Sequence, residues 1–277
     1  MAGLEIDQEF LEKFSLGDIA PLPACQRLAD QMHAELHSGS GVVWLQGFPA
    51  PLFSVIQMKF FYLVLGAAMG RPMDNYGRLY DVRDYGGSYT TERIPVSQTH
   101  AATGFHTDSS ARNTMPDVVA LLCVQPAEQG GESLIVSGAR VHEELRNNNP
   151  TALTTLYREF IRDVVTPGAG KSSQALLNNR FPVFSQGLYS PQISFRYMRY
   201  WIEKGHTRAN MDLASEQLEV LDALDQLLES PRFALNFKLE AGDQLWVNNH
   251  VVAHNRTEFV DDPRQPRHFV RMWIATS

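Results

Sequence analysis

Two segments far apart in the chain carry the residues with the clearest potential for chemistry. Residues 104–110 read GFHTDSS and contain His106 and Asp108, and residues 248–257 read NNHVVAHNRT and contain two further histidines. Two imidazoles and one carboxylate are the ligand set of a mononuclear non-haem Fe(II) site that keeps coordination positions open. On a strand, residues two apart point to the same face, so His106 and Asp108 could bind one ion together. The third ligand would then come from the other segment.

The His-x-Asp/Glu pattern is weak by itself, because it occurs three times, at residues 33–35, 106–108 and 142–144. The first and third matches lie in helix-like contexts. On a helix, residues two apart project roughly 200° apart around the axis, so neither pair can chelate one ion. We interpret His33 and His142 as members of solvated helix faces. Only the central match lies among glycine, threonine and serine, ahead of a strand-like run.

The third ligand could be His250 or His254. A His-x-x-x-His pair on a helix would favour zinc, but the glutamate of the HExxH zinc motif is missing here. Val251 and Val252 lie between the two histidines and favour a strand. The residues alone therefore leave the choice of histidine open.

Composition and charge exclude several classes of protein. The chain has 277 residues, a net charge of −7 and 44% hydrophobic residues, which is ordinary for a globular protein. A pI of about 5.7 provides no general basic field for nucleic acid or an anionic membrane. The first residues lack the pattern of a signal peptide, and the longest apolar run, residues 60–69, is too short to cross a bilayer. We expect a cytoplasmic protein whose Cys25 and Cys123 are buried small hydrophobes.

The order of the elements predicts an α+β fold. We expect helices at residues 22–37, 52–69, 138–146, 150–158 and 215–229, with the helices concentrated in the first half. Strands are expected at 41–49, where a turn punctuates the strand, and at 117–124, 132–136, 159–165, 181–184, 191–197, 233–239, 243–248, 251–255 and 267–275. Residues 78–103 are polar and read as a long loop of the kind that covers a site. No linker divides the sequence, so residues 1–277 are interpreted as one domain.

Four ordered blocks resemble a known family. They are GFHTDS at 104–109, GGESL at 130–134, GDQLWVNN at 242–249, and HNR at 254–256 followed by Arg267 and Arg271. From about residue 40 to its end, the chain resembles the TauD/TfdA (clavaminate synthase-like) Fe(II)/2-oxoglutarate-dependent dioxygenases. A stretch at 190–197 is compatible with the family but less specific. The resemblance implies a double-stranded β-helix (jelly-roll) core with flanking helices, and iron held by His106, Asp108 and His254. His250 is then left with a packing role or an indirect one.

The resemblance also assigns roles to three further residues. It implies that Arg267, helped by the hydroxyl of Ser133, grips the distal carboxylate of 2-oxoglutarate; a guanidinium can make paired bonds to a carboxylate. Strand periodicity places Arg271 on the same face, about 13 Å further along. In the taurine-type relatives the matching arginine binds the anionic group of the substrate. We therefore expect Arg271 to bind a substrate carboxylate, with pairing to a nearby acidic residue as the structural alternative.

The implied cofactors are Fe(II), 2-oxoglutarate as cosubstrate, and O2, with release of succinate and CO2. The expected reaction is hydroxylation of a small carboxylate-bearing metabolite such as an amino acid or a derivative, with desaturation or cyclisation as the alternative outcome. No nucleic acid or membrane partner is expected, and a homo-oligomer is compatible with the sequence. Rival interpretations are a non-catalytic jelly-roll binding protein, a zinc hydrolase, and a halogenase. The last would need a small residue where Asp108 stands.

Overall fold

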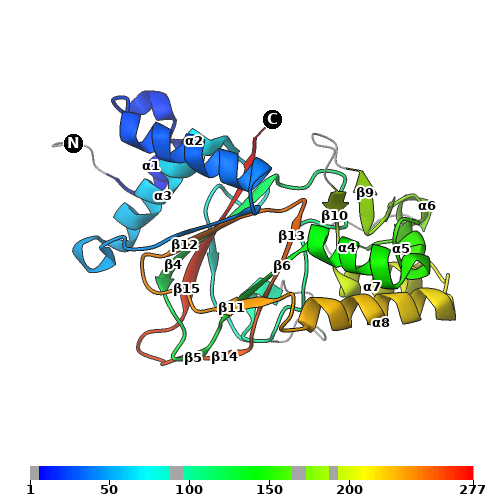
Figure 1. Cartoon of the computed structure of the whole chain (residues 1–277). Helices are drawn as coiled ribbons and strands as arrows, with labels where there is room; N and C mark the ends of the chain where they lie inside the picture. Colours follow the sequence, from blue (N-terminus) through cyan, green and yellow to red (C-terminus); the bar gives the residue numbers. More distant parts are fainter. Residues whose placement is uncertain (1–5, 88–95, 164–172, 187–192, 277) are drawn as a thin grey trace.

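The computed structural model describes residues 6–87, 96–163, 173–186 and 193–276, and an antiparallel β-sheet lies at its centre (Figure 1). Strands β1, β12, β4 and β15 lie side by side in that order, and the short strands β2 and β3 pair with β15. Their bounds are Val42–Leu45 (β1), Arg71–Pro72 (β2), Tyr80–Val82 (β3), Val118–Gln125 (β4), Gln244–Asn248 (β12) and His268–Ala275 (β15). The sheet therefore joins segments from both ends of the chain.

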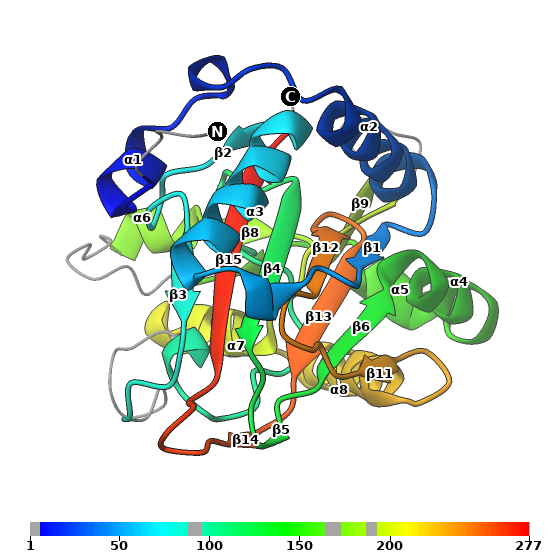
Figure 2. The same ribbon diagram turned by 90° about the vertical axis from the view of Figure 1, so that its left-hand side faces the viewer.

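A smaller antiparallel sheet packs against the inner face of the first. Its order is β11 (Leu235–Phe237), β6 (Ser133–Ser137) and β13 (Val252–Arg256). One buried cluster takes Val119 and Phe269 from the large sheet and Ile135 and Val252 from the small one, so both sheets fill the space between them. Figure 2 shows β6 and β13 beside β4 and β15. This pair of sheets is the expected jelly-roll core, and the α+β class is confirmed.

Helices α1, α2 and α3 cover the outer face of the large sheet (Figure 2). They span Gln8–Lys13, Pro23–Ser38 and Val55–Met69, and short 3-10 turns lie at Leu16–Asp18 and Ala50–Leu52. Alternation along β4 decides which side chains face them. Val118, Ala120 and Leu122 pack against the helices, whereas Val119 and Cys123 point between the sheets. Both faces of β4 are buried, which explains its nearly continuous apolar sequence.

A second group of helices packs beside the small sheet around its own core (Figure 1). Its members are α4 (Gly138–Asn148), α5 (Pro150–Leu156), α7 (Arg199–Arg208) and α8 (Ser215–Glu229), with α6 (Ser173–Leu177) nearby in the chain. Short strand pairs complete the described fold: β5 (Gln129–Gly130) with β14 (Phe259–Val260), β7 (Phe160–Ile161) with β8 (Arg180–Phe181), and β9 (Phe184–Gln186) with β10 (Ile193–Phe195). None of the helices in the described ranges is long and apolar enough to cross a membrane.

Several sequence expectations are wrong in detail. Helices are not concentrated in the first half, since α4 to α8 occupy the middle of the chain. Residues 78–103 contain β3 and a 3-10 turn at Val96–Gln98, while residues 88–95 lie outside the described residues. The strands expected at 159–165 and 191–197 are only two and three residues long where the structure describes them.

The burial of His142 also differs from the sequence expectation. It lies on helix α4 as expected, but it is only 8% exposed, and its Nε2 lies 2.9 Å from the hydroxyl of Tyr157. The buried residues of α4 are Gly138, Val141, His142 and Leu145, which recur at helical spacing. His142 therefore belongs to the buried face of its helix, whereas His33 is exposed as expected.

Candidate active site

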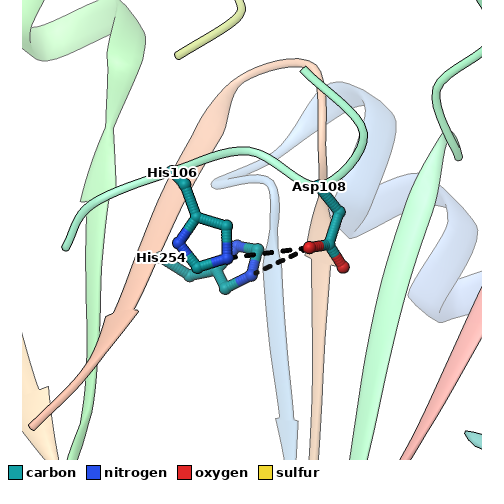
Figure 3. Close-up of side chains that lie close together, drawn as sticks. All are labelled: His106, Asp108 and His254. Carbon is teal, nitrogen blue, oxygen red and sulfur yellow. Dashed lines mark ion pairs between the residues drawn. The ribbon is translucent and has the colours of Figure 1, made fainter. Parts of the chain in front are cut away.

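The two segments singled out in the sequence meet through their backbones. The amide of His106 donates to the carbonyl of His254, and the amide of His254 donates back to His106, both at 2.9 Å. His254 lies on β13, an edge strand of the small sheet, and the isolated antiparallel bridge attaches His106 to that edge. The imidazole centroids are 4.3 Å apart (Figure 3). Backbone geometry therefore fixes the spacing of the two rings.

Asp108 is held by a buried asparagine. The backbone amide of Asp108 donates to Oδ1 of Asn249 at 2.8 Å. In return, Nδ2 of Asn249 donates to the backbone carbonyls of Asp108 and Pro116 at 3.0 and 3.1 Å. The side chain of Asn249 is fully buried, and every one of these bonds is to backbone. Ser109 then adopts a φ of 57°, a left-handed conformation that is uncommon outside glycine. This bend turns the chain away from the site directly after the carboxylate.

The three side chains point toward one another (Figure 3). Oδ1 of Asp108 lies 3.6 Å from Nε2 of His106 and 4.0 Å from Nε2 of His254. All three ligand atoms lie within 4.8 Å of one another, close enough for one ion to contact each of them. Nδ1 of His106 lies 2.9 Å from the carbonyl of Gly104, which can only accept, so that nitrogen carries the proton. Nε2 of His106 is then left with its lone pair directed at the centre.

Electrostatics favour the protonation states that bind a metal. Burial alone would raise the pKa of Asp108, but Arg271 and the two imidazoles lower it far below the usual range, so the carboxylate is anionic. Burial, with a further contribution from His106, lowers the pKa of His254 to about 3, so its imidazole is neutral. Neutral imidazoles and an ionised carboxylate are the forms that bind metal.

The other oxygen of Asp108 faces the large sheet. Oδ2 accepts a hydrogen bond from Nε1 of Trp273 at 2.6 Å and lies 3.3 Å from Nη1 of Arg271. Both donors project from the inner face of β15, where Phe269 also lies. The guanidinium of Arg271 also lies over the rings of Tyr80 and Trp273, at 5.1 and 4.6 Å. The two oxygens of Asp108 therefore have different surroundings.

Arg267, just before β15, is a buried cation without side-chain hydrogen bonds to the described residues. It is 4% exposed, and its Nε and Nη1 have no partner there. Its guanidinium lies between aromatic rings, 5.0 Å from that of Phe259 and 3.9 Å from that of Phe269. Burial lowers its pKa to about 9, which still leaves it cationic at neutral pH. A buried charge without hydrogen bonds is costly, so this site is suited to an anionic ligand.

Comparison with known proteins identifies the family. The family model for "Taurine catabolism dioxygenase TauD, TfdA family" matches residues 7–273. The chain belongs to the TauD/TfdA family. It is thus an Fe(II)- and 2-oxoglutarate-dependent dioxygenase, as the sequence resemblance implied.

Similar proteins include two curated enzymes and one solved structure. FR-33289 synthase of Streptomyces rubellomurinus is 26% identical over 263 residues, which cover 92% of this chain and 74% of that protein. Uridine-5'-phosphate dioxygenase of a Streptomyces species is 33% identical over 187 residues, covering 64% and 63%. The crystal structure of asparagine oxygenase superposes with a TM-score of 0.71 at 18% identity, covering 98% of this chain and 84% of that one. The structural similarity confirms the fold.

The donors of this dioxygenase fit both groups that its family requires. His106, Asp108 and His254 offer two nitrogens and one carboxylate oxygen to a metal. Arg267 offers unpaired, buried guanidinium donors to a carboxylate such as those of 2-oxoglutarate. Gly131 lies beside this guanidinium, and its φ of 71° is a left-handed conformation that favours glycine. Ser133, two residues later, is buried on β6 opposite Arg256 of β13.

His250, the competing histidine of this dioxygenase, lies elsewhere. Its Nε2 lies 2.9 Å from Oδ1 of Asp117, and its amide donates to Oδ1 of Asn248. Among the described residues, His106, Asp108 and His254 form a group whose ligand atoms could hold one metal ion, and His250 is not a member of it.

The sequence does not identify two residues that hold Asp108 in place, Asn249 and Trp273. Asn249 lies in a block that resembles the family, but a buried asparagine has no sequence signal that separates it from any other polar residue after a strand. Trp273 shares a strand face with Arg271 by periodicity, yet the direction of its N–H depends on the tertiary structure.

Proposed function

We propose that this chain hydroxylates a small metabolite that carries a carboxylate, such as an amino acid or a derivative of one. His106, Asp108 and His254 would bind Fe(II), Arg267 with Ser133 would bind 2-oxoglutarate, and Arg271 would bind the substrate carboxylate. The observation that carries the proposal is the convergence of two imidazoles on the buried, ionised carboxylate of Asp108, with the cation Arg271 beside it. The proposal takes residues 1–277 as one domain.

The protein's own residues would bind and orient the reactants. Iron, when bound, supplies the redox chemistry that couples O2 and 2-oxoglutarate to oxidation of the substrate. Three protein ligands leave the remaining positions for these small molecules. Asp108, kept anionic, contributes a full negative charge to the metal. Arg267 would neutralise the distal carboxylate of 2-oxoglutarate within an aromatic, water-poor environment, where a charge-assisted hydrogen bond is strong.

Arg271 supports the choice of substrate class. Its side chain is 15% exposed and lines a small cavity of about 10 Å³ with Met73, Tyr76, Gly77, Tyr80 and Trp273, next to Asp108. The cavity is about the size of one water molecule, so what supports an anionic substrate is the partly exposed cation and not the volume of the cavity. The similar uridine-5'-phosphate dioxygenase and asparagine oxygenase are, by their names, enzymes of small metabolites. Arg271 also pairs with Asp108, so the structural alternative has a partner in the described residues.

The metal assignment is tested by spectroscopy without a known substrate. Anaerobic Fe(II) with 2-oxoglutarate should give a weak visible charge-transfer band, and His106→Ala, Asp108→Ala or His254→Ala should each abolish it. His250→Ala is the matched control, because this histidine is close in sequence but pairs with Asp117. A band that survives in His254→Ala and is lost in His250→Ala would reverse the choice of histidine.

The substrate class is tested by a screen of amino acids and small carboxylates for stimulated release of succinate, with mass spectrometry of the oxidised product. A gain of one oxygen atom is expected. Arg271→Ala should then raise the concentration of substrate required and leave that of 2-oxoglutarate unchanged. If the requirement for 2-oxoglutarate rose instead, Arg271 would be a second cation for the cosubstrate.

A further inference from the structure

The indole N–H of Trp273 is aimed at the oxygen of Asp108 that faces away from the histidines. Oδ1 lies 3.6 and 4.0 Å from the two imidazole nitrogens, whereas Oδ2 lies 2.6 Å from Nε1 of Trp273. This contact is shorter than the ordinary range for N–H donors to oxygen, and N–H bonds to an ionised acceptor are in general shorter than neutral ones. The carboxylate is therefore oriented with Oδ1 toward the two histidines and Oδ2 toward Trp273.

The position of Trp273 is fixed by packing. Its side chain is 9% exposed, its ring packs edge-on against Tyr76 with centroids 5.3 Å apart, and the guanidinium of Arg271 lies over it at 4.6 Å. Its carbonyl also accepts from the amide of Met73 at 2.8 Å. The strand, the neighbouring rings and the cation together hold the indole in place.

An indole is suited to this task because it can only donate. Its single N–H has no acceptor function and no rotating hydrogen, so the bond to Oδ2 cannot be reversed or redirected. Arg271 differs, since its Nη1 lies 3.3 Å from Oδ2 and 3.5 Å from Oδ1 and does not discriminate between them. Trp273 is therefore the residue that distinguishes the two oxygens.

We infer that Trp273 is a positioning residue for the metal ligand Asp108, an inference that rests on the ligand set proposed above. By occupying Oδ2, the indole N–H makes Asp108 present Oδ1 alone to the metal. Without that donor, Oδ2 would keep only the longer contact from Arg271, which does not discriminate between the two oxygens, and it would be free to turn toward the ion. The carboxylate would then bind through both oxygens and take a position that cosubstrate or O2 needs. Partners that orient metal ligands in this way typically contribute 10–100-fold in metal affinity.

The test is titration of the metal-free protein with Co(II), which reports affinity and, through the intensity of its visible absorption, coordination number. Trp273→Phe should weaken Co(II) binding by about 10–100-fold and lower the absorption intensity of the saturated complex. Replacement of Trp273 by β-(3-benzothienyl)alanine keeps the bicyclic shape and puts a sulfur atom, which cannot donate, in place of the N–H, so it should give the same result. This second variant decides the matter if Trp273→Phe does not fold.

Two matched controls are present in the chain. Trp44 also donates its indole N–H to a carboxylate, Oδ2 of Asp243 at 3.2 Å, and the fully buried Trp246 donates to Oε1 of Gln244 at 3.2 Å. Trp44→Phe and Trp246→Phe should leave Co(II) binding unchanged. Co(II) affinity within twofold of wild type and an identical spectrum in the benzothienyl variant would overturn the inference, as would an equal loss in the control variants. If His254→Ala bound Co(II) like wild type, the proposed ligand set itself would fail instead.

Discussion

Two buried arginines, Arg162 and Arg267, differ in what their guanidinium groups contact. Arg162 is fully buried, and its Nη1 and Nη2 donate to the carbonyls of Ser110, Phe181, Pro182 and Arg196. Arg267 is nearly as buried, with 4% exposure, but has no side-chain hydrogen bond to the described residues. Burial lowers the pKa of each to about 9. Burial and pKa therefore do not separate them, and only the hydrogen bonds do.

The difference indicates which cation is structural and which is suited to a ligand. Arg162 leaves only Nε without a partner in the described chain, and its bonds join the segment after Asp108 to the strands at 180–196. A third buried cation, Lys59, is satisfied in another way, by the carboxylate of Asp81 at 2.8 Å. Because carbonyls or a carboxylate satisfy the other two, the unpaired guanidinium of Arg267 stands out as a binding group.

Removing Arg162, whose guanidinium is hydrogen-bonded to carbonyls, should have the largest effect on stability. Arg162→Met leaves up to four carbonyls without a donor, and we expect a loss of about 3–5 kcal/mol in the free energy of unfolding. Urea denaturation measures it. Arg146→Met is the control, since this arginine is exposed and pairs with Glu143 on the surface of α4. Equal stability of the two variants would remove the distinction drawn above.

Removing the unpaired arginine should affect binding and spare the fold. Arg267→Met should weaken 2-oxoglutarate binding by about 2–5 kcal/mol, or roughly 30-fold to several-thousand-fold. The free energy of unfolding without ligand should stay the same or rise, because a buried unsatisfied charge is removed. Anaerobic titration of the charge-transfer band measures the first quantity and urea denaturation the second. Unchanged 2-oxoglutarate affinity would mean that another cation holds its distal carboxylate.

Breaking the ion pair between Lys59 and Asp81 should lower the free energy of unfolding by an intermediate amount that depends on pH. Burial alone would raise the pKa of Asp81, but hydrogen bonds from His268 and Lys59 lower it to about 2. A carboxyl with a depressed pKa stabilises the fold above its unfolded pKa of about 3.9, and this contribution is lost as pH falls through the folded value. Asp81→Asn should therefore destabilise by about 1–2 kcal/mol at pH 7, because Asp81 is partly exposed. The difference from wild type should vanish toward pH 2 in denaturation experiments, and a difference that persisted there would exclude this charge as its source.

The smallest effect is expected at Ser133, which the sequence resemblance places beside Arg267. Loss of one hydroxyl in Ser133→Ala should weaken 2-oxoglutarate binding by about 0.5–1.5 kcal/mol, or about 2- to 12-fold. Ser133→Thr keeps the hydroxyl and should retain the affinity of the wild type. If both variants lost affinity equally, the volume at this position and not its hydroxyl would matter.

The parts of the site that depend on local pattern could be predicted from the sequence. The pairing of His106 with Asp108 follows from their spacing, and the inner face of β15 with Phe269 and Trp273 follows from strand periodicity. Periodicity does not place Arg267, because it precedes β15 and the register shifts between His268 and Phe269. The choice of His254 over His250 needed the family resemblance, because both lie in one short segment. The anchoring of Asp108 by Asn249 and Trp273 could not be predicted, since it joins residues more than a hundred positions apart in the chain.

The errors in the fold have equally specific causes. His142 was placed on a solvated face because it is polar, although its spacing from Val141 and Leu145 matches the buried face of α4. Helix α7 was missed because Arg199–Arg208 is rich in charge, and only Ile202, Gly205 and His206 are buried in it. In both cases the polarity of a side chain was a poor guide to its burial.

The reciprocal backbone bridge between His106 and His254 has a thermodynamic consequence. Because the two histidines come from distant segments joined only in the folded chain, a ligand that requires both cannot bind the unfolded chain in the same way. Such a ligand raises the melting temperature by mass action, with a stabilisation of about 2.7 kcal/mol at a hundredfold excess over its Kd. Binding of metal, cosubstrate and substrate can therefore be detected one after another from the rise in melting temperature that each causes, and no measurement of turnover is needed.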